Sequence, residues 1–127
     1  MEIVTQINFA LPNHPGSLAR MTDNLRAADV NIEAIFCEEG SERTMFHLIV
    51  DDPETAKIVL RTDHDISETP VLAITAKNKP GSIAHIARMC GGAGINIRHI
   101  YATSGGREST VYLSVDDLEK AKVILGK

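Results

Sequence analysis

Apolar and polar residues alternate over 7–11 and again over 72–76, which predicts a β-strand at each place. A Pro-Gly pair ends each alternating run, and apolar residues then recur at helical spacing over 18–28 and 83–93. After each of these helical segments come two short apolar segments typical of strands, and then a second segment with helical spacing. Each half of the chain is therefore predicted to fold in the order strand, helix, strand, strand, helix.

The second half of the chain repeats the first at an offset of 65 residues. Residues 13–19 (NHPGSLA) return as 78–84 (NKPGSIA), and 30–32 (VNI) return as 95–97 (INI). No gap is needed from residue 13 to residue 60, and chance does not produce a match of that length. The chain is therefore a duplicated unit, which we divide into residues 1–69 and 70–127.

Glycines and aspartates mark the turns and the helix starts. Gly40 in one copy and the pair Gly105–Gly106 in the other lie where a hairpin must turn. Pro53 can occupy the first position of a helix without losing a hydrogen bond. We expect four polar side chains to cap the helices: Ser17, Asp52, Ser82 and Asp117.

A fourth strand should complete each unit. In the first unit residues 65–69 fit this strand, and it continues through Pro70 into the next alternating run. The last helix of the second unit ends at the end of the sequence, whereas residues 1–5 precede the first core strand. We expect residues 1–5 to complete the second sheet, in the same chain or in a partner. The predicted class is α+β, with antiparallel sheets, helices on one face, and a second unit that lacks its own C-terminal strand.

Composition narrows the classes of function. There are 17 acidic and 13 basic residues, three Phe, two Tyr and no Trp, so neither a basic surface nor stacking residues favour nucleic-acid binding. No run approaches the roughly 18 apolar residues of a membrane span. The first six residues do not resemble a secretion signal, and Cys37 and Cys90 form no disulfide framework. We expect a cytoplasmic protein that binds neither nucleic acid nor membrane.

A sheet covered by helices on one side leaves its other face free. In the first unit this free face is expected to carry Met45, His47 and Ile49, with Ile35 and Cys37 beside them. The face could belong to a minor secondary core, or it could pair with a partner. We favour pairing, and expect a homodimer, because units of this size are marginally stable alone.

The junction between the first strand and the first helix of each unit is the best candidate site. Free amides and the positive end of the helix dipole favour a carboxylate there, and glycine permits close approach. Asparagine supplies both a donor and an acceptor, so the set suits a zwitterion. Pro-Gly and Asn are also common in turns, and we prefer binding because both asparagine positions recur. The candidate ligand-binding residues are Asn13, His14, Gly16, Ser17, Asn31, Asn78, Lys79, Gly81, Ser82 and Asn96.

Enzymatic chemistry has weaker support. The five histidines show no close metal-ligand spacing, and Cys37 and Cys90 lack a second cysteine nearby. The paired aspartates are explained more simply by helix capping, and Ser17 and Ser82 have no common base beside them. We therefore expect no catalytic residues, no metal and no cofactor.

The repeated pattern of Asn-x-Pro-Gly-Ser, a helix, Val/Ile-Asn-Ile, a hairpin and a last helix resembles the ACT domain, here in tandem. The resemblance implies a ferredoxin-like βαββαβ fold, units that pair side by side, and a small ligand, usually an amino acid, between units. In serine-sensing members, a loop residue and an Asn at the second strand hold the ligand. Asn13 and Asn78 match the first position, and Asn31 and Asn96 match the second.

These observations support two hypotheses about function. The first is a non-catalytic amino-acid sensor that binds its ligand between ACT units. The second is a regulatory subunit, similar to that of acetolactate synthase, which docks on a separate metabolic enzyme through Ile35, Met45 and Ile49.

Overall fold

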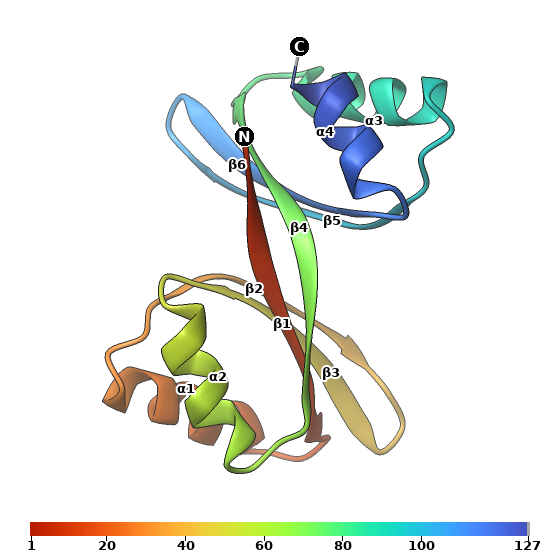
Figure 1. Cartoon of the computed structure of the whole chain (residues 1–127). Helices are drawn as coiled ribbons and strands as arrows, with labels where there is room; N and C mark the ends of the chain where they lie inside the picture. Colours follow the sequence, from red (N-terminus) through yellow and green to blue (C-terminus); the bar gives the residue numbers. More distant parts are fainter. Residues whose placement is uncertain (127) are drawn as a thin grey trace. The chain divides into compact units, whose positions relative to one another are not determined.

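A computed structural model describes residues 1–126 of the chain. Contacts divide the chain into two compact units. The first unit is Thr5–Thr69, and the second runs from Pro70 onward and also includes Met1–Val4. Each unit is described separately below, with the labels of Figure 1.

The first unit contains two helices, two complete strands and parts of two further strands. In chain order its elements are β1 (Glu2–Pro12), α1 (Ser17–Ala27), β2 (Ile32–Glu39), β3 (Arg43–Val50), α2 (Pro53–Arg61) and the start of β4 (Ile66–Lys77). The strand order is β2-β3-β1-β4, and β3 pairs antiparallel with both β1 and β2. Both helices cover the same face of this sheet (Figure 1).

The second unit repeats this arrangement. Its elements after β4 are α3 (Ser82–Gly92), β5 (Ile97–Gly105), β6 (Glu108–Val115) and α4 (Leu118–Leu125). The strand β6 pairs antiparallel with both β4 and β5, and α3 and α4 lie on one face of the sheet (Figure 1). The predicted class, an α+β pair of ferredoxin-like units with helices on one face, is confirmed.

Two strands belong to both units. β1 continues without a break from Met1–Val4 into the first unit, and β4 continues through Pro70 into the second. Met1 lies close to Gly126, since a methyl group added at Gly126 would meet Met1 Cε at 3.2 Å. That residues 1–5 complete the sheet of the second unit stays a prediction, which a truncation described below can test.

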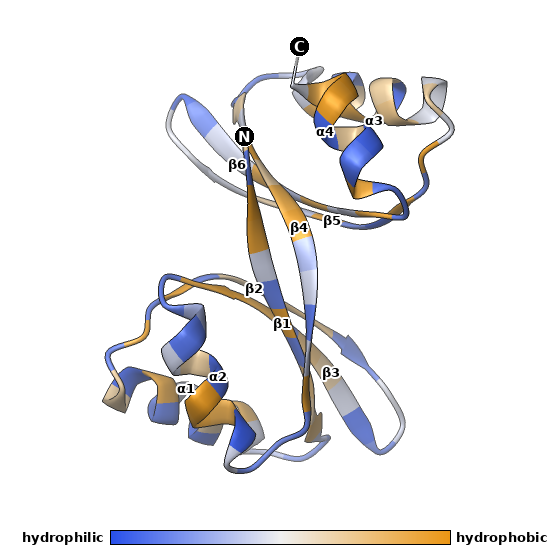
Figure 2. Ribbon diagram, viewed as in Figure 1, coloured by the Kyte–Doolittle hydropathy of each residue, from blue (hydrophilic) through white to orange (hydrophobic). Residues whose placement is uncertain are grey.

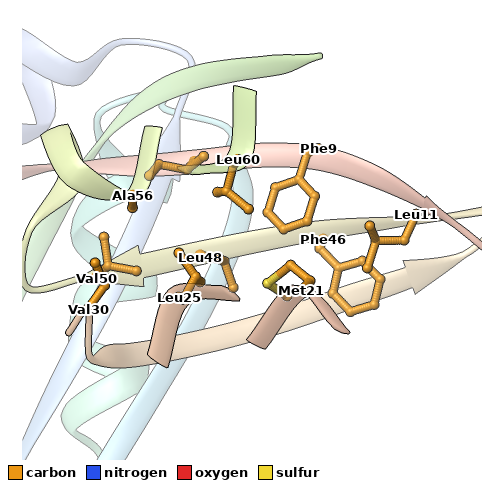
Figure 3. Close-up of a cluster of buried hydrophobic side chains, with 11 residues drawn as sticks. Phe9, Leu11, Met21, Leu25, Val30, Phe46, Leu48, Val50, Ala56 and Leu60 are labelled. Atoms are coloured by element: carbon orange, nitrogen blue, oxygen red, sulfur yellow. The ribbon is translucent and has the colours of Figure 1, made fainter. Parts of the chain in front are cut away.

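Alternation along the strands determines which side chains enter the first core. Successive strand residues point to opposite faces, so every second residue of β1 and β3 faces the helices. Phe9 and Phe46 are paired in the register and stack with ring centroids 6.0 Å apart. Figure 3 shows them beside Met21 and Leu25 from α1 and Leu60 from α2.

The helices are amphipathic, with hydrophobic and hydrophilic residues on different sides (Figure 2). In the first unit, α1 buries Met21 and Leu25, as the helical spacing predicts. In the second unit, α3 buries Ile86 and Cys90 at the equivalent positions. These residues hold each helix against its own sheet.

Two of the four predicted caps are confirmed. The Asp52 side chain accepts a hydrogen bond from the Thr55 amide at the start of α2, and Pro53 is the first helical residue. The Asp117 side chain accepts from the Lys120 amide at the start of α4. These aspartates therefore have a structural role.

The face of β3 that points away from the helices is less open than the sequence predicted. Met45 and Ile35 are exposed, at 39% and 43%, but His47 and Ile49 are buried, at 6% and 2%. The prediction that His47 and Ile49 form a free face is therefore wrong. Alternation shows which side of the sheet a residue occupies, but it does not show what covers that side.

Candidate ligand-binding hollows at the starts of α1 and α3

The starts of α1 and α3 depend on glycine. Gly16 precedes α1 with φ 91°, and Gly81 precedes α3 with φ 95°. Side chains with a Cβ rarely adopt such values, so both positions favour glycine for the backbone alone. Neither helix has a side-chain cap.

The prediction that Ser17 and Ser82 cap these helices is therefore wrong. Ser17 is already the first helical residue, and its Oγ lies 3.2 Å from His14 Nδ1. The Ser82 hydroxyl donates to the carbonyl oxygen of Lys77 at 2.6 Å. Both serines lie one position after the cap. The cap position itself is occupied by Gly16 or Gly81, whose left-handed backbone turns the chain into the helix.

A helix start without a cap has a specific electrostatic character. The first amides of a helix lack partners within the helix, and the helix dipole places partial positive charge there. In α2 and α4 an aspartate side chain accepts a hydrogen bond from one of these amides, whereas no side chain caps α1 or α3 in this way. The first turns of α1 and α3 are therefore suited to an external anion such as a carboxylate.

A hollow of about 370 Å³ adjoins the start of α1, and we call it the α1 hollow. Leu11 and Met21, both buried, form its apolar floor. The remaining lining residues are mostly polar: Pro12, His14, Pro15, Gly16, Ser17, Arg20, Asn24, Arg43, Asp63 and His64. Its charged groups include both signs, so it can attract a carboxylate and an ammonium group.

An equivalent hollow of about 490 Å³ adjoins the start of α3, and we call it the α3 hollow. Its charged or titratable lining residues are all basic, and they are Lys77, Lys79 and His85. The other lining residues are Ile74, Thr75, Ala76, Pro80, Gly81, Ser82, Ile86, Ile124 and Leu125. Among the residues that the structure describes, no carboxylate side chain lines this hollow.

Six of the ten predicted site residues thus line the two hollows. His14, Gly16 and Ser17 do so in the first unit, and the second unit has the equivalent set. Sequence reasoning missed five basic residues of the hollows: Arg20, Arg43, His64, Lys77 and His85. Arg20 and His85 could have been found from the sequence, because each lies one helical turn after its cap glycine.

The asparagines before the Pro-Gly pairs hold the hairpin turns. Asn13 Nδ2 donates to the carbonyl of Gly40 at 3.3 Å, and Asn78 Nδ2 donates to the carbonyl of Gly106 at 2.8 Å. Neither asparagine is among the residues that line the hollows. Their repetition is explained by the hairpin contact, and their role as ligand contacts stays a prediction.

The other two asparagines lie away from the hollows of their own units. The backbone amide of Asn31 donates a hydrogen bond to Oδ1 of Asp51, and the backbone amide of Asn96 donates to Oδ1 of Asp116. Asn31 lines a different hollow, near the end of α1, together with Asp51. Within one unit, therefore, the structure does not bring the two asparagines and the cap glycine to a single site.

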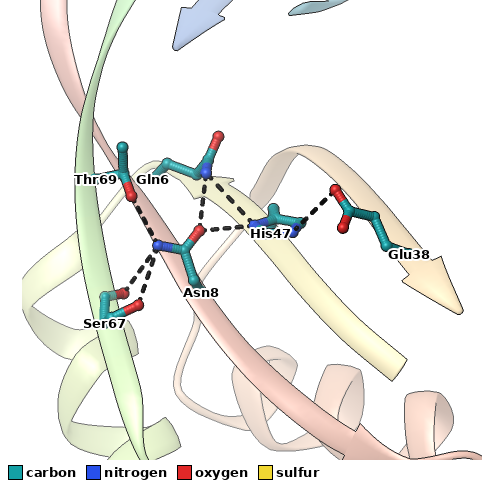
Figure 4. A network of polar contacts seen from close by, with 6 residues as sticks. All are labelled: Gln6, Asn8, Glu38, His47, Ser67 and Thr69. Carbon is teal, nitrogen blue, oxygen red and sulfur yellow. Dashed lines mark hydrogen bonds and ion pairs between the residues drawn. The ribbon is translucent and has the colours of Figure 1, made fainter. Parts of the chain in front are cut away.

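A buried polar network lies on the face of the first sheet away from its helices (Figure 4). Asn8 Oδ1 lies 2.7 Å from His47 Nδ1 and accepts from Gln6 Nε2 at 2.8 Å. Asn8 Nδ2 donates to Thr69 Oγ1 at 2.9 Å. Bonds of this kind satisfy polar groups that would be costly to bury unpaired, so the network stabilises the pairing of β1 with its neighbours.

The two cysteines differ in accessibility. Cys37 is exposed, whereas Cys90 is buried in the second core, and burial raises the pKa of its thiol. A raised pKa reduces the thiolate fraction and so makes Cys90 a poor nucleophile.

In residues 1–126, none of the helices is both long and apolar enough to cross a membrane.

The duplicated ferredoxin-like units define a tandem α+β protein, and a comparison with protein families identifies its class. The profile of the family described as "ACT domain pair" matches residues 1–127, so the chain belongs to this family. ACT domains are regulatory, non-catalytic modules, and the resemblance seen in the sequence is confirmed.

Solved structures show the same fold. Protein BT0572 from Bacteroides thetaiotaomicron superposes with a TM-score of 0.92 at 23% identity, over 98% of this chain and 87% of that one. The regulatory subunit of aspartate kinase from Thermus thermophilus gives 0.70 at 16% identity, over 99% and 96%. The corresponding subunit from Thermus flavus gives 0.63 at 14% identity, over 98% and 92%. None of the curated proteins matches the chain in sequence.

Proposed function

We propose that the protein is a non-catalytic regulatory protein that binds free amino acids at the α1 and α3 hollows. The observation that supports this most is repeated in both units: a helix that begins at a left-handed glycine, without a side-chain cap, beside a hollow lined by basic residues. The α-carboxylate would bind the first-turn amides of the helix, with the basic side chains adding attraction.

Each hollow also offers groups for the rest of the ligand. In the α1 hollow Asp63 can pair with an ammonium group, and Leu11 and Met21 provide apolar contact. In the α3 hollow the Thr75 hydroxyl can accept a hydrogen from the ammonium group. The expected position of the ligand between units stays a prediction.

Regulation requires that the ligand bind one state of the protein more tightly than another. We propose that the signal passes to a separate enzyme of amino-acid metabolism, as the family implies. Homodimer formation stays an expectation of the same proposal.

The docking alternative is less favoured. Its apolar face was to consist of Ile35, Met45 and Ile49, and Ile49 is only 2% exposed. The two residues that remain exposed make a smaller surface than the hypothesis requires.

A thermal-shift screen with the twenty amino acids tests the proposal. A ligand at about 100 times its dissociation constant stabilises the folded state by about 2.7 kcal/mol, which raises the melting temperature by several degrees. The double variant Arg20→Gln/Lys79→Gln should lose most of the shift, whereas Lys120→Gln, an exposed lysine outside both hollows, should keep it. The proposal fails if no amino acid raises the melting temperature.

A further inference from the structure

The two cores are filled differently near their hollows. In the first unit Phe9 is 1% exposed and stacks on Phe46. At the repeat offset, the equivalent residues of the second unit are Ile74 and Val111. The second unit therefore has no aromatic ring at these two positions. In the first unit the His64 ring, from the segment after α2, also stacks on Phe9 with ring centroids 5.6 Å apart, so it helps to cover Phe9.

The consequence appears in which residues line the hollows. Ile74 is only partly buried and lines the α3 hollow, whereas Phe9 is sealed inside the core and does not line the α1 hollow. Leu60 is also sealed, at 2% exposure, but its counterpart Leu125 lines the α3 hollow. The second unit thus opens part of its core to the hollow.

This opening makes the wall of the α3 hollow aliphatic. Five apolar side chains from β4, α3 and α4 line it: Ile74, Ala76, Ile86, Ile124 and Leu125. Lys77 and Lys79 lie on the segment that leads from β4 to the start of α3, and no carboxylate is present among the described lining residues. The hollow therefore combines positive charge beside the helix start with an apolar wall.

The α1 hollow has the opposite character. Arg43, Asp63 and His64 line it and also line a neighbouring hollow of about 500 Å³, so these residues connect the two. The second of these hollows adds Arg61 and Asp65. A ligand that extends from the start of α1 in this direction meets charged groups of both signs.

We propose that the α3 hollow selects amino acids with an aliphatic side chain, such as leucine, and that the α1 hollow selects amino acids with a polar or charged side chain. This inference rests on the proposed function, because it assumes that both hollows bind amino acids. The aliphatic side chain would enter the space beside Ile74 that a phenyl ring fills in the first unit.

Desolvation determines the selectivity. An aliphatic side chain gains from leaving water, and each methylene group changes binding by roughly tenfold or more in an apolar site. An ammonium side chain would lose its hydration beside Ile74 and Leu125, and no carboxylate among the described lining residues compensates for that loss. A carboxylate side chain at the same place would also lose hydration, because Lys77 and Lys79 lie at the other end of the hollow, between β4 and the start of α3, where the α-carboxylate binds. We expect leucine to bind the α3 hollow at least about tenfold more tightly than aspartate or lysine does.

The test is a titration of the full ¹⁵N-labelled chain with L-leucine, L-aspartate or L-lysine, followed by NMR. The amide signals of Gly81 and Ser82 report on the α3 hollow, and those of Gly16 and Ser17 report on the α1 hollow. Leucine should shift the first pair at the lowest concentration, and a charged amino acid should shift the second pair. Equal or tighter binding of aspartate or lysine at Gly81 would overturn the inference.

Variants that copy the first unit into the second provide the sharpest control. Ile74→Phe should fill the space and weaken leucine binding at Gly81 by about tenfold or more, while the response at Gly16 is unchanged. Ala76→Leu fills the same hollow with a smaller change, so it replaces Ile74→Phe in the test if the phenyl ring disturbs folding. Lys120→Gln, which lies outside the hollow, should behave as the original chain.

The outcomes separate this inference from the proposed function. If no amino acid shifts either pair of signals, both fail. If amino acids bind but the α3 hollow shows no preference for leucine, or if filling it leaves leucine binding intact, only the selectivity fails.

Discussion

The two units share their scaffold contacts and differ in how their cores are filled. Asn13 and Asn78 each donate to a carbonyl of the hairpin turn, that of Gly40 and that of Gly106, and Asp52 and Asp117 cap equivalent helices. By contrast, the position of buried Phe9 is taken in the second unit by the partly buried Ile74. The duplication has kept these turn and cap contacts, whereas some side chains that pack in the first core, such as Phe9, have changed.

This difference teaches how to interpret repeated residues. A residue that recurs in both copies can do so because the fold needs it, as the asparagine contacts with the hairpin turns show. A residue that differs between copies can mark where the two units have separate tasks. For this protein, the residues that line the hollows beside α1 and α3 include such differences.

The largest expected effect tests the difference between the cores. Phe9→Ala should lower the free energy of unfolding by about 3–5 kcal/mol, because it leaves a cavity in a sealed core. Ile74→Ala should cost roughly half as much, since Ile74 is only partly buried and already borders a hollow. Urea denaturation measures both, and equal losses would contradict the view that the second core is less completely filled.

The next effect concerns the N-terminal residues. Deletion of Met1–Val4 should destabilise the second unit by about 1–2 kcal/mol, because Val4 is partly buried and full burial of such a side chain contributes about 1.5–3 kcal/mol, whereas Ile3 is 42% exposed and adds less. Hydrogen exchange should show the loss in residues 70–126 and little change in β3. Glu2→Ala, at an exposed position, is the matched control, and unchanged protection after the deletion would contradict the predicted strand.

The cap glycines should show a similar cost in both units. Gly16→Ala or Gly81→Ala should lower stability by about 1–2 kcal/mol, because each forces a Cβ into the left-handed region. Gly91→Ala is the control: Gly91 lies inside α3 with open space around it, so alanine there should stabilise by about 0.5–1 kcal/mol. If all three variants had the same effect, backbone strain would not explain the choice of glycine.

The smallest effect is the pH dependence of the cap on α2. The Thr55 hydroxyl, and then its amide, hydrogen-bond to Asp52 and hold the pKa of that carboxyl below its ordinary value of 3.8. A lowered pKa contributes stability above the ordinary value, and that contribution is lost as the pH falls through the lowered one. Asp52→Ala should therefore be less stable than the original chain at pH 7, and the gap should shrink in acid.

A matched substitution identifies the cause of this shift. Thr55→Val removes the hydroxyl and keeps the amide, so it should raise the pKa of Asp52 toward its ordinary value. Titration of the Asp52 carboxyl by NMR measures the change. An unaltered titration curve would show that the hydroxyl is not the cause.

The repeat and the periodicity together predicted the α+β fold, the helices and the aspartate caps. These features depend on local chemistry: alternation defines a strand, and an Asp before Pro53 defines a helix start. The Pro-Gly pairs were expected to end a strand and to precede a helix, and Gly16 and Gly81 do lie directly before α1 and α3. Local rules were sufficient for these elements.

The remaining features depend on packing between distant residues. Ile49 was placed on the correct side of its strand, yet its burial could not be read from alternation. The hydroxyl of Ser82 contacts the Lys77 carbonyl, because Gly81 takes the cap position instead. The aliphatic wall of the α3 hollow needed the structure, since its residues come from β4, α3 and α4, and α4 lies far from the other two in the sequence.

The shared strands have a consequence for how this molecule can be divided. Because β1 and β4 each pass without interruption from one unit to the other, no single cut separates the chain into two whole halves. A gene fragment that encodes only the second half would lack the four N-terminal residues that belong with it. An expression design for the second compact unit alone would therefore have to join residues 1–4 to the segment that begins at Pro70.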